Sequence, residues 1–204
     1  MLDRLRAQAQ VHGIHYLENQ AVTIDGILFL GATLWTDFEF FGPEKRAQMM
    51  VAAQLGLNDF KVIQSEPLMN EGKRFGYKRL KLTPFHTLQR HQESLAWLKQ
   101  ELHHGVPERT VVVSHHYPLP NSSHPNWAHD EIAAIYGSKL PEDILLGAKV
   151  WNHGHSHDSS DYRIDDELRS VRVVCNPWGY PLTSQKNKFE NHAFNAGLLI
   201  KIGN

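Results

Sequence analysis

Apolar and polar residues follow one another in short blocks, and the spacing inside these blocks predicts both helices and strands. Residues 22–30 predict a β-hairpin, because Asp25-Gly26 is a favoured two-residue turn pair between two apolar runs. The best-marked helix covers Pro84–His104, where Thr83 can cap the first turn and Gly105 can end the last. Its buried face is predicted by a stripe at helical spacing: Phe85, Leu88, Leu95, Leu98 and Leu102.

Shorter blocks predict the remaining elements. Further strands are expected at residues 15–17, 111–114, 149–152, 171–175 and 196–202, and further helices at residues 1–10, 43–55, 129–140 and 142–146. The continuous apolar run Val111–Ser114 predicts a strand that is covered on both faces. These strands are too irregularly spaced for an alternating barrel, so we expect a layered mixed α/β sandwich. We expect one domain, because 204 residues suit a single core.

Composition narrows the classes of function. The net charge is −1, so no polyanion-binding surface is expected and nucleic acid is not favoured as a partner. No apolar run approaches the roughly 18 residues of a membrane span, and the charged N-terminus lacks a signal-like apolar core. The single cysteine, Cys175, excludes an intrachain disulfide, fits a cytoplasmic location and is expected to be an inert buried thiol.

Histidine is the compositional outlier, with 14 residues, and several follow predicted strands directly. His115 and His116 follow the strand at 111–114, while His155 and His157 follow the strand at 149–152. A strand end holds an imidazole rigidly, and a neutral ring nitrogen is a good ligand for a divalent transition metal. On an extended backbone a two-residue spacing sends His155 and His157 to the same side, and Gly154 permits a close approach. We expect His115 to be the better ligand of its pair and His116 to face the substrate.

These motifs resemble the last two sequence motifs of the calcineurin-like metallophosphoesterases. The resemblance rests on Ser114–Pro118 and Gly154–His157, and it extends to Asn176–Tyr180 and to Leu30–Asp37. The resemblance covers most of the chain, from about residue 13 to 183, and the motifs have the order, spacing and strand contexts of that family. The resemblance implies a partial four-layer α/β/β/α sandwich with mixed sheets, and a site that holds two divalent metal ions, commonly Mn, Fe or Zn.

The resemblance also implies roles for individual residues. His115 and His155 would bind one metal, His157 would bind the other, and His116 would serve catalysis near the substrate. The implied activity is two-metal hydrolysis of small-molecule phosphate mono- or diesters, in which metal-activated water attacks phosphorus.

Three earlier motifs of the family are missing from this sequence, namely Asp-x-His, Gly-Asp-x-x-Asp and Gly-Asn-His followed by Asp or Glu. The sequence therefore resembles a member that begins after the third motif, and carboxylates such as Asp37 or Asp158 are alternative ligands for a weaker one-metal site. A catalytically inactive remnant that binds at most one metal or a protein partner is the alternative. A histidine-rich metal-storage or sensor module is a third hypothesis.

Other polar residues have simpler interpretations. His91 lies on the apolar stripe of the long predicted helix and is expected to be a satisfied core residue. His153 is expected either to pack in the strand or to support a metal ligand. Asp158 is expected to orient His157 or to cap the following turn. Trp178 is expected to line either the cleft or the core. A basic run predicts either a solvated face or a contact with a distal charge of the substrate: Arg74, Lys78, Arg79 and Lys81.

Overall fold

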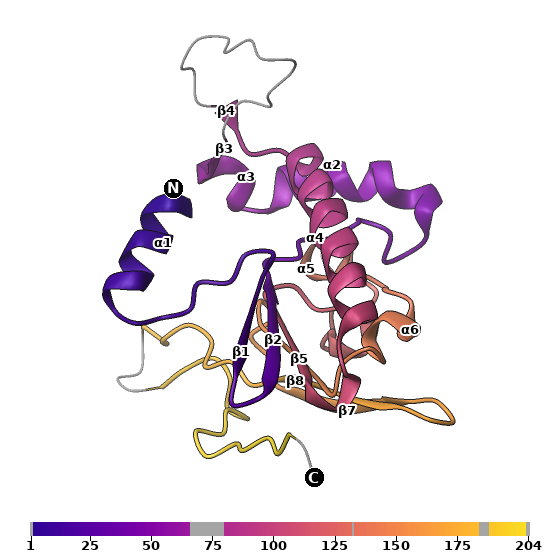
Figure 1. Ribbon diagram of the computed structural model, residues 1–204. Coiled ribbons are helices and arrows are strands. Elements are labelled where there is room, and N and C mark those ends of the chain that lie inside the picture. Colours follow the sequence, from indigo (N-terminus) through magenta and orange to yellow (C-terminus); the bar gives the residue numbers. More distant parts are fainter. Residues whose placement is uncertain (1, 66–79, 132, 184–187, 203–204) are drawn as a thin grey trace.

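The centre of the fold is a six-stranded mixed β-sheet (Figure 1). The computed structural model describes residues 2–65, 80–131, 133–183 and 188–202. In spatial order the strands are β1 (Gln20–Ile24), β2 (Ile27–Ala32), β5 (Thr110–Ser114), β6 (Val150–His153), β8 (Ser170–Cys175) and β7 (Ser160–Asp165). The four inner strands are parallel, and each edge strand pairs antiparallel with its neighbour. The carboxyl ends of β5 and β6 therefore lie side by side.

The helices and short segments follow the chain in a simple order. The helices are α1 (Leu2–Val11), α2 (Arg46–Gly56), α3 (Asp59–Val62), α4 (Pro84–His104), α5 (Ala133–Tyr136) and α6 (Glu142–Leu145). A small two-stranded ladder joins β3 (Gln64–Ser65) to β4 (Leu80–Lys81), and 3-10 turns cover Pro43–Lys45, Pro107–Arg109 and Pro120–Ser122. Among the described residues, no helix has both the length and the apolar character that crossing a membrane requires.

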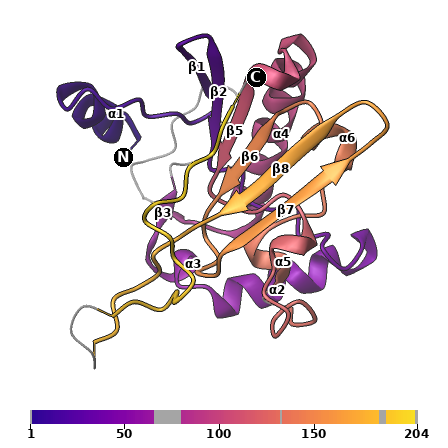
Figure 2. The same cartoon turned by 90° about the horizontal axis from the view of Figure 1, so that it is seen from below.

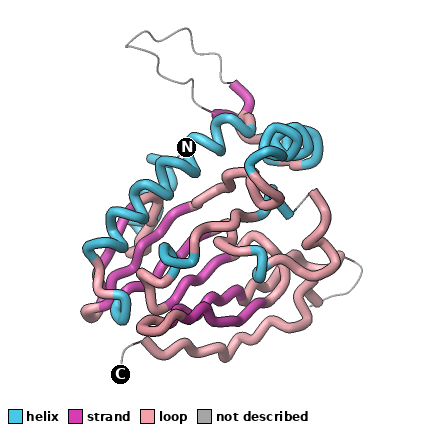
Figure 3. The backbone as a smooth tube through the Cα atoms, turned by 90° about the vertical axis from the view of Figure 1, so that its right-hand side faces the viewer, coloured by secondary structure: helices cyan, strands magenta, loops and turns pink. Residues whose placement is uncertain are grey.

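One face of the sheet is covered by helices. Helix α4 runs along this face (Figure 3), and its Leu98 and Leu102 join Leu145 of α6 in the main core. The sheet contributes the apolar side chains of alternate positions, among them Leu30, Val112, Trp151 and Val173. Period-two alternation thus places one set of residues from every central strand against the helices.

The opposite face of the sheet carries a groove of about 430 Å³. Phe29, Val111 and Val113 line it from β2 and β5, and the C-terminal segment, residues 198–202, lies alongside (Figure 2). Along that segment Leu198, Ile200 and Ile202 line the groove and alternate with exposed residues. Val113 remains 37% exposed, so the expectation that Val111–Ser114 is covered on both faces is only partly met.

A second apolar cluster lies apart from the sheet and is built from helices and a loop. It contains Phe38, Met49 and Ala53, together with Phe60 of α3 and Ala134 of α5. Because α3 and α5 also carry polar residues that face the ends of β5 and β6, this cluster positions the surroundings of the histidine motifs.

Several elements confirm the sequence-based predictions. The hairpin forms with Asp25 and Gly26 at positive φ of 49° and 77°, and α4 begins and ends at the predicted residues. Thr83 and His86 form a reciprocal cap at its start. Leu98 and Leu102 are buried on the predicted stripe, whereas Phe85 is exposed.

Other elements were predicted wrongly. Residues 15–17 and 196–202 form no strand, and the helix expected over 129–140 is limited to α5. Strand β7 was not predicted, although its residues alternate: Tyr162 and Ile164 face the core between exposed charged residues. Pairing explains these errors. Residues 15–17 and 196–202 have no partner in the sheet, while β7 pairs with β8 along six positions.

Candidate metal centre

Three histidine rings meet at the carboxyl edge of the sheet. The ring centroids of His115 and His155 are 4.7 Å apart, those of His116 and His155 are 4.5 Å apart, and those of His115 and His116 are 5.1 Å apart. Two imidazoles that share a tetrahedral ion place their centroids roughly 5 Å apart, given Zn–N lengths of about 2.0 Å. We call these three residues the histidine cluster. The centroid distances within the cluster, 4.5–5.1 Å, are close to that value.

The backbone brings the two strand ends together. Strands β5 and β6 pair in parallel register, and beyond them the Gly154 amide donates to the His115 carbonyl at 3.1 Å. His155 then adopts a left-handed conformation with φ of 66°, which is uncommon for a residue other than glycine. This turn swings the His155 ring back over the end of β5, where it meets the other two rings.

A loop from β2 forms the floor of the cluster. The Thr33 carbonyl accepts hydrogen bonds from the backbone amide of His116 at 3.3 Å and from its Nδ1 at 3.1 Å. The Trp35 ring lies 5.1 Å from the His116 ring, and both Leu34 and Trp35 have positive φ. Left-handed backbone at non-glycine residues costs free energy and tends to gather at functional sites. Here three such residues, including His155, adjoin one cluster.

Burial keeps the cluster uncharged. Desolvation, with the neighbouring rings adding to it, lowers the pKa of His155 to about 3 and that of His116 well below its usual value. His115 is the solvent-exposed member, and desolvation where its ring packs against the others lowers its pKa as well, against the opposing effect of the Asp59 carboxylate. Neutral imidazoles keep a free electron pair on one nitrogen, which is the form that binds metals.

Hydrogen bonds identify which nitrogens are available. A carbonyl oxygen can only accept, so Nδ1 of His116 donates to Thr33 and its Nε2 carries the free electron pair. Nε2 of His155 is buried without a hydrogen-bond partner. An unpaired buried polar atom costs about 1–3 kcal/mol. Ser94 Oγ and His86 Nε2 of α4 are also buried without a partner, but of the three only the nitrogen of His155 belongs to the histidine cluster.

His157 lies at the margin of the cluster rather than inside it. The extended backbone predicted for residues 155–157 does not form, because the chain bends at His155. The Nδ1 of His157 instead contacts the Glu190 carboxylate at 2.6 Å, and its ring meets Tyr180 edge to face at 4.5 Å. Glu190, rather than the predicted Asp158, is therefore the carboxylate that orients His157.

Carboxylates are sparse around the three rings. Among the described residues, no group of three or more His, Cys, Asp or Glu side chains is arranged to hold a metal ion. Asp59 of α3 acts on His115 and on Tyr136 through its charge. Asp37 lies in a second layer, where burial raises its pKa and the His91 charge opposes that effect.

Two other buried histidines are satisfied by hydrogen bonds. The Nδ1 of His91 contacts the Leu34 carbonyl at 3.0 Å, which confirms the prediction of a core role. The Nδ1 of His153 contacts the Gly154 carbonyl at 3.2 Å, and its Nε2 lies 3.4 Å from the Ser160 hydroxyl. Cys175 is buried as expected, and desolvation raises its pKa to about 11.

His116 lies deeper than the sequence suggested. It is only 2% exposed, and its contact with substrate stays a prediction. Because Nδ1 is bonded to Thr33, only Nε2 is free for that contact. Sequence reasoning also missed Tyr136, whose ring covers His155 at a centroid distance of 4.4 Å, and Glu190. Neither residue belongs to a motif, since each reaches the site from a distant segment.

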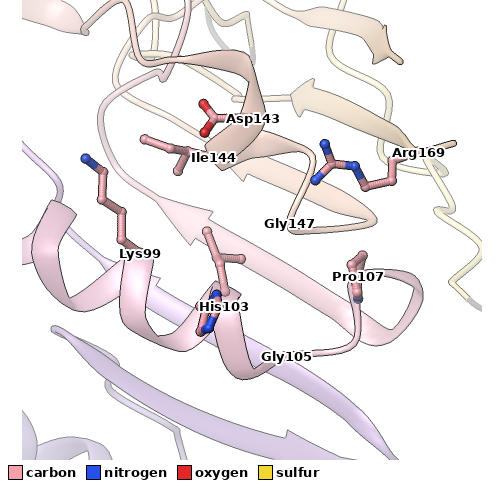
Figure 4. A pocket seen from close by; sticks show the side chains of 9 residues that line it. Lys99, His103, Gly105, Pro107, Asp143, Ile144, Gly147 and Arg169 are labelled. Carbon is pink, nitrogen blue, oxygen red and sulfur yellow. The ribbon is translucent and has the colours of Figure 1, made fainter. Parts of the chain in front are cut away.

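A separate hollow of about 310 Å³ lies at the opposite edge of the sheet, before β5 and β6 begin. Lys99 and Arg169 lie on its two sides, with Asp143 and His103 between them (Figure 4). Nε and Nη2 of Arg169 are already engaged by Asp166. Three residues of the predicted basic run, Arg74, Lys78 and Arg79, lie outside the described residues.

Comparison with known proteins adds no assignment. No protein-family profile, no curated protein and no solved structure matches this chain. The geometry of the histidine cluster is therefore the main guide to function.

Proposed function

We propose that this chain binds a divalent transition metal at the histidine cluster and hydrolyses small phosphate mono- or diesters there. The observation that carries the proposal is the buried, unpartnered Nε2 of His155 beside two further neutral imidazoles. The resemblance of the two histidine motifs to those of the metallophosphoesterases supports the same chemistry.

The proposed site would take one cation. His115 and His155 would hold it, and His157 would provide a second position at the margin. Imidazole is a common ligand of zinc in catalytic sites. When bound, a divalent ion supplies Lewis-acid polarisation of a phosphoryl group and makes a nearby water more acidic.

The chain's own residues would hold this site in place. Glu190 accepts the Nδ1 proton of His157 and so fixes its tautomer, and the Thr33 carbonyl does the same for His116. Tyr136 covers one side of the His155 ring and excludes water from it. His115, the exposed member, remains the side from which an ester can approach.

A second candidate function is metal or partner binding without turnover. The supporting observation is the absence, among the described residues, of a carboxylate that joins the three rings. Two neighbouring dications need anionic ligands to balance their charge, which neutral imidazoles do not supply.

We also propose that the fold is part of a four-layer α/β/β/α sandwich. In a four-layer α/β/β/α sandwich, a second sheet packs on the face that α4 does not cover. The apolar groove on that face of the present sheet is consistent with such packing.

The test combines metal content with turnover. The purified chain is loaded with Mn²⁺, its bound metal is measured by mass spectrometry, and hydrolysis of an aryl phosphate and an aryl phosphodiester is followed. We expect one bound ion per chain and turnover that His155→Ala abolishes. His104→Ala is the matched control, since His104 is an exposed histidine at the far end of α4.

The possible results separate the two functions. Metal binding that depends on His155 but brings no turnover of either ester would establish the non-catalytic function. Metal binding that His155→Ala leaves unchanged would refute both.

A further inference from the structure

Two large aromatic side chains near the histidine cluster are exposed. Trp178 is 54% exposed and Tyr180 is 66% exposed. The indole of Trp178 stacks on Phe189 at a centroid distance of 3.9 Å and on Phe194 at 5.7 Å. We call Trp178, Tyr180, Phe189 and Phe194 the aromatic platform. Exposed aromatic rings offer apolar faces on which a ligand or a partner can stack.

The aromatic platform is held by a dense set of hydrogen bonds. Asn176 and Asn195 exchange two, at 2.9 and 3.0 Å. The Asn191 amide donates to the Pro177 carbonyl at 2.6 Å, and the Glu190 backbone amide donates to the Tyr180 carbonyl at 3.0 Å. A surface fixed in this way is organised before a ligand arrives, so binding orders little additional chain.

One carboxylate joins the aromatic platform to His157, at the margin of the histidine cluster. Glu190 accepts from the Tyr180 backbone amide at 3.0 Å and contacts Nδ1 of His157 at 2.6 Å. Gly179 has φ of 75°, and a Cβ there would lie 3.0 Å from the Cβ of Glu190. Glycine at this position therefore lets Glu190 sit close enough to hold Tyr180 and His157 together.

We infer that the aromatic platform stacks the base of a nucleotide whose phosphate lies at the histidine cluster. The inference rests on the proposed function and narrows its substrate class to nucleotides. The Tyr180 ring lies 4.5 Å from the His157 ring, so a base on Tyr180 stays within the reach of a sugar linked to that phosphate. Aromatic side chains stack on every base, since each base has a π face.

The size of the exposed surface favours a small planar group over a protein. A stable protein interface buries about 800 Å² on each partner, whereas two exposed rings bordered by Asn191, Glu190 and Lys188 form a far smaller apolar area. A protein that binds the platform without any response to nucleosides is the competing outcome.

The experiment compares substrates with and without a base. Phosphate release from AMP and from ribose 5-phosphate is measured on the Mn²⁺-loaded chain. We expect the kcat/KM ratio to favour AMP by roughly tenfold, the size of a base-stacking contribution. Tyr180→Leu and Trp178→Leu should each lower that ratio, while Tyr180→Phe keeps it. Trp127→Leu is the matched control, because Trp127 is also 54% exposed but lies on another loop.

A second measurement needs neither metal nor turnover. Contact between adenosine and the chain is followed by saturation-transfer NMR in the presence of EDTA. Contact that Tyr180→Leu abolishes and Trp127→Leu preserves supports the aromatic platform, even if no ester is hydrolysed. A wild-type kcat/KM for AMP close to that for ribose 5-phosphate, or absence of adenosine contact, would overturn this inference. Either result would leave the proposals of metal binding and ester hydrolysis intact.

Discussion

Polar side chains that the strands bury under the helices and a histidine buried at the carboxyl edge of the same sheet differ in their hydrogen-bond partners. On the face, Trp151 Nε1 donates to the Ser114 hydroxyl at 2.9 Å, and the Tyr162 hydroxyl pairs with that of Ser122 at 2.9 Å. At the edge, the buried Nε2 of His155 has no partner, and the backbone of His155 is left-handed. The two hydrogen-bonded pairs on the face stabilise the fold, whereas the unpaired nitrogen and the left-handed backbone of His155 are costs that a ligand can offset.

The largest expected effect lies on the helix-covered face. Trp151 is fully buried and contacts both helices and strands of the main core. Trp151→Ala should lower the free energy of unfolding by about 3–5 kcal/mol, as measured by urea denaturation. A loss below about 1 kcal/mol would show that this face does not carry the stability assigned to it.

Two buried histidines sharpen the comparison directly. His91 is hydrogen-bonded, so His91→Ala should cost about 2 kcal/mol through the lost bond and the cavity. His155→Ala should cost less than about 1 kcal/mol in metal-free buffer, because the loss of packing is offset by removal of an unpaired nitrogen. Urea denaturation in EDTA measures both, and the reverse order of the two costs would contradict the contrast between the regions.

The third prediction concerns the support of His157. Glu190→Gln keeps the shape of the side chain but removes the charge that fixes the His157 tautomer. The affinity for Mn²⁺ should fall about tenfold, as for other residues that orient metal-binding histidines. Isothermal titration calorimetry gives the affinity, and Glu167→Gln on an exposed loop is the control. An unchanged affinity would exclude His157 from metal binding.

The smallest expected effect is a loss of stability at high pH caused by Tyr162, which lies on the helix-covered face. Burial raises the pKa of Tyr162 to about 12. The folded state therefore holds this proton more tightly than the unfolded chain, and stability present below pH 10 is lost as the pH rises toward 12. Between pH 9 and pH 11 the free energy of unfolding should fall by about 1 kcal/mol for this half-buried group. Tyr162→Phe should flatten that slope; an equal slope in both proteins would refute the assignment.

Local pattern was sufficient for much of the fold. The hairpin around Asp25-Gly26, the full extent of α4 and the strands at β5, β6 and β8 follow from turn residues, caps and apolar runs. The failures at residues 15–17 and 196–202 share one cause. Their apolar residues suit a strand, but a strand also needs a partner, and partners are chosen by the rest of the fold.

The sequence by itself determined that histidines would stand at the ends of two buried strands, because apolar runs and the residues after them are local features. Only the tertiary structure decided which rings meet. The left-handed turn at His155 places its ring against that of His116, and His157 contacts Glu190 instead. It also placed Tyr136 over the site. Such contacts join residues distant in the chain, and their geometry depends on strand pairing and packing that no short motif encodes.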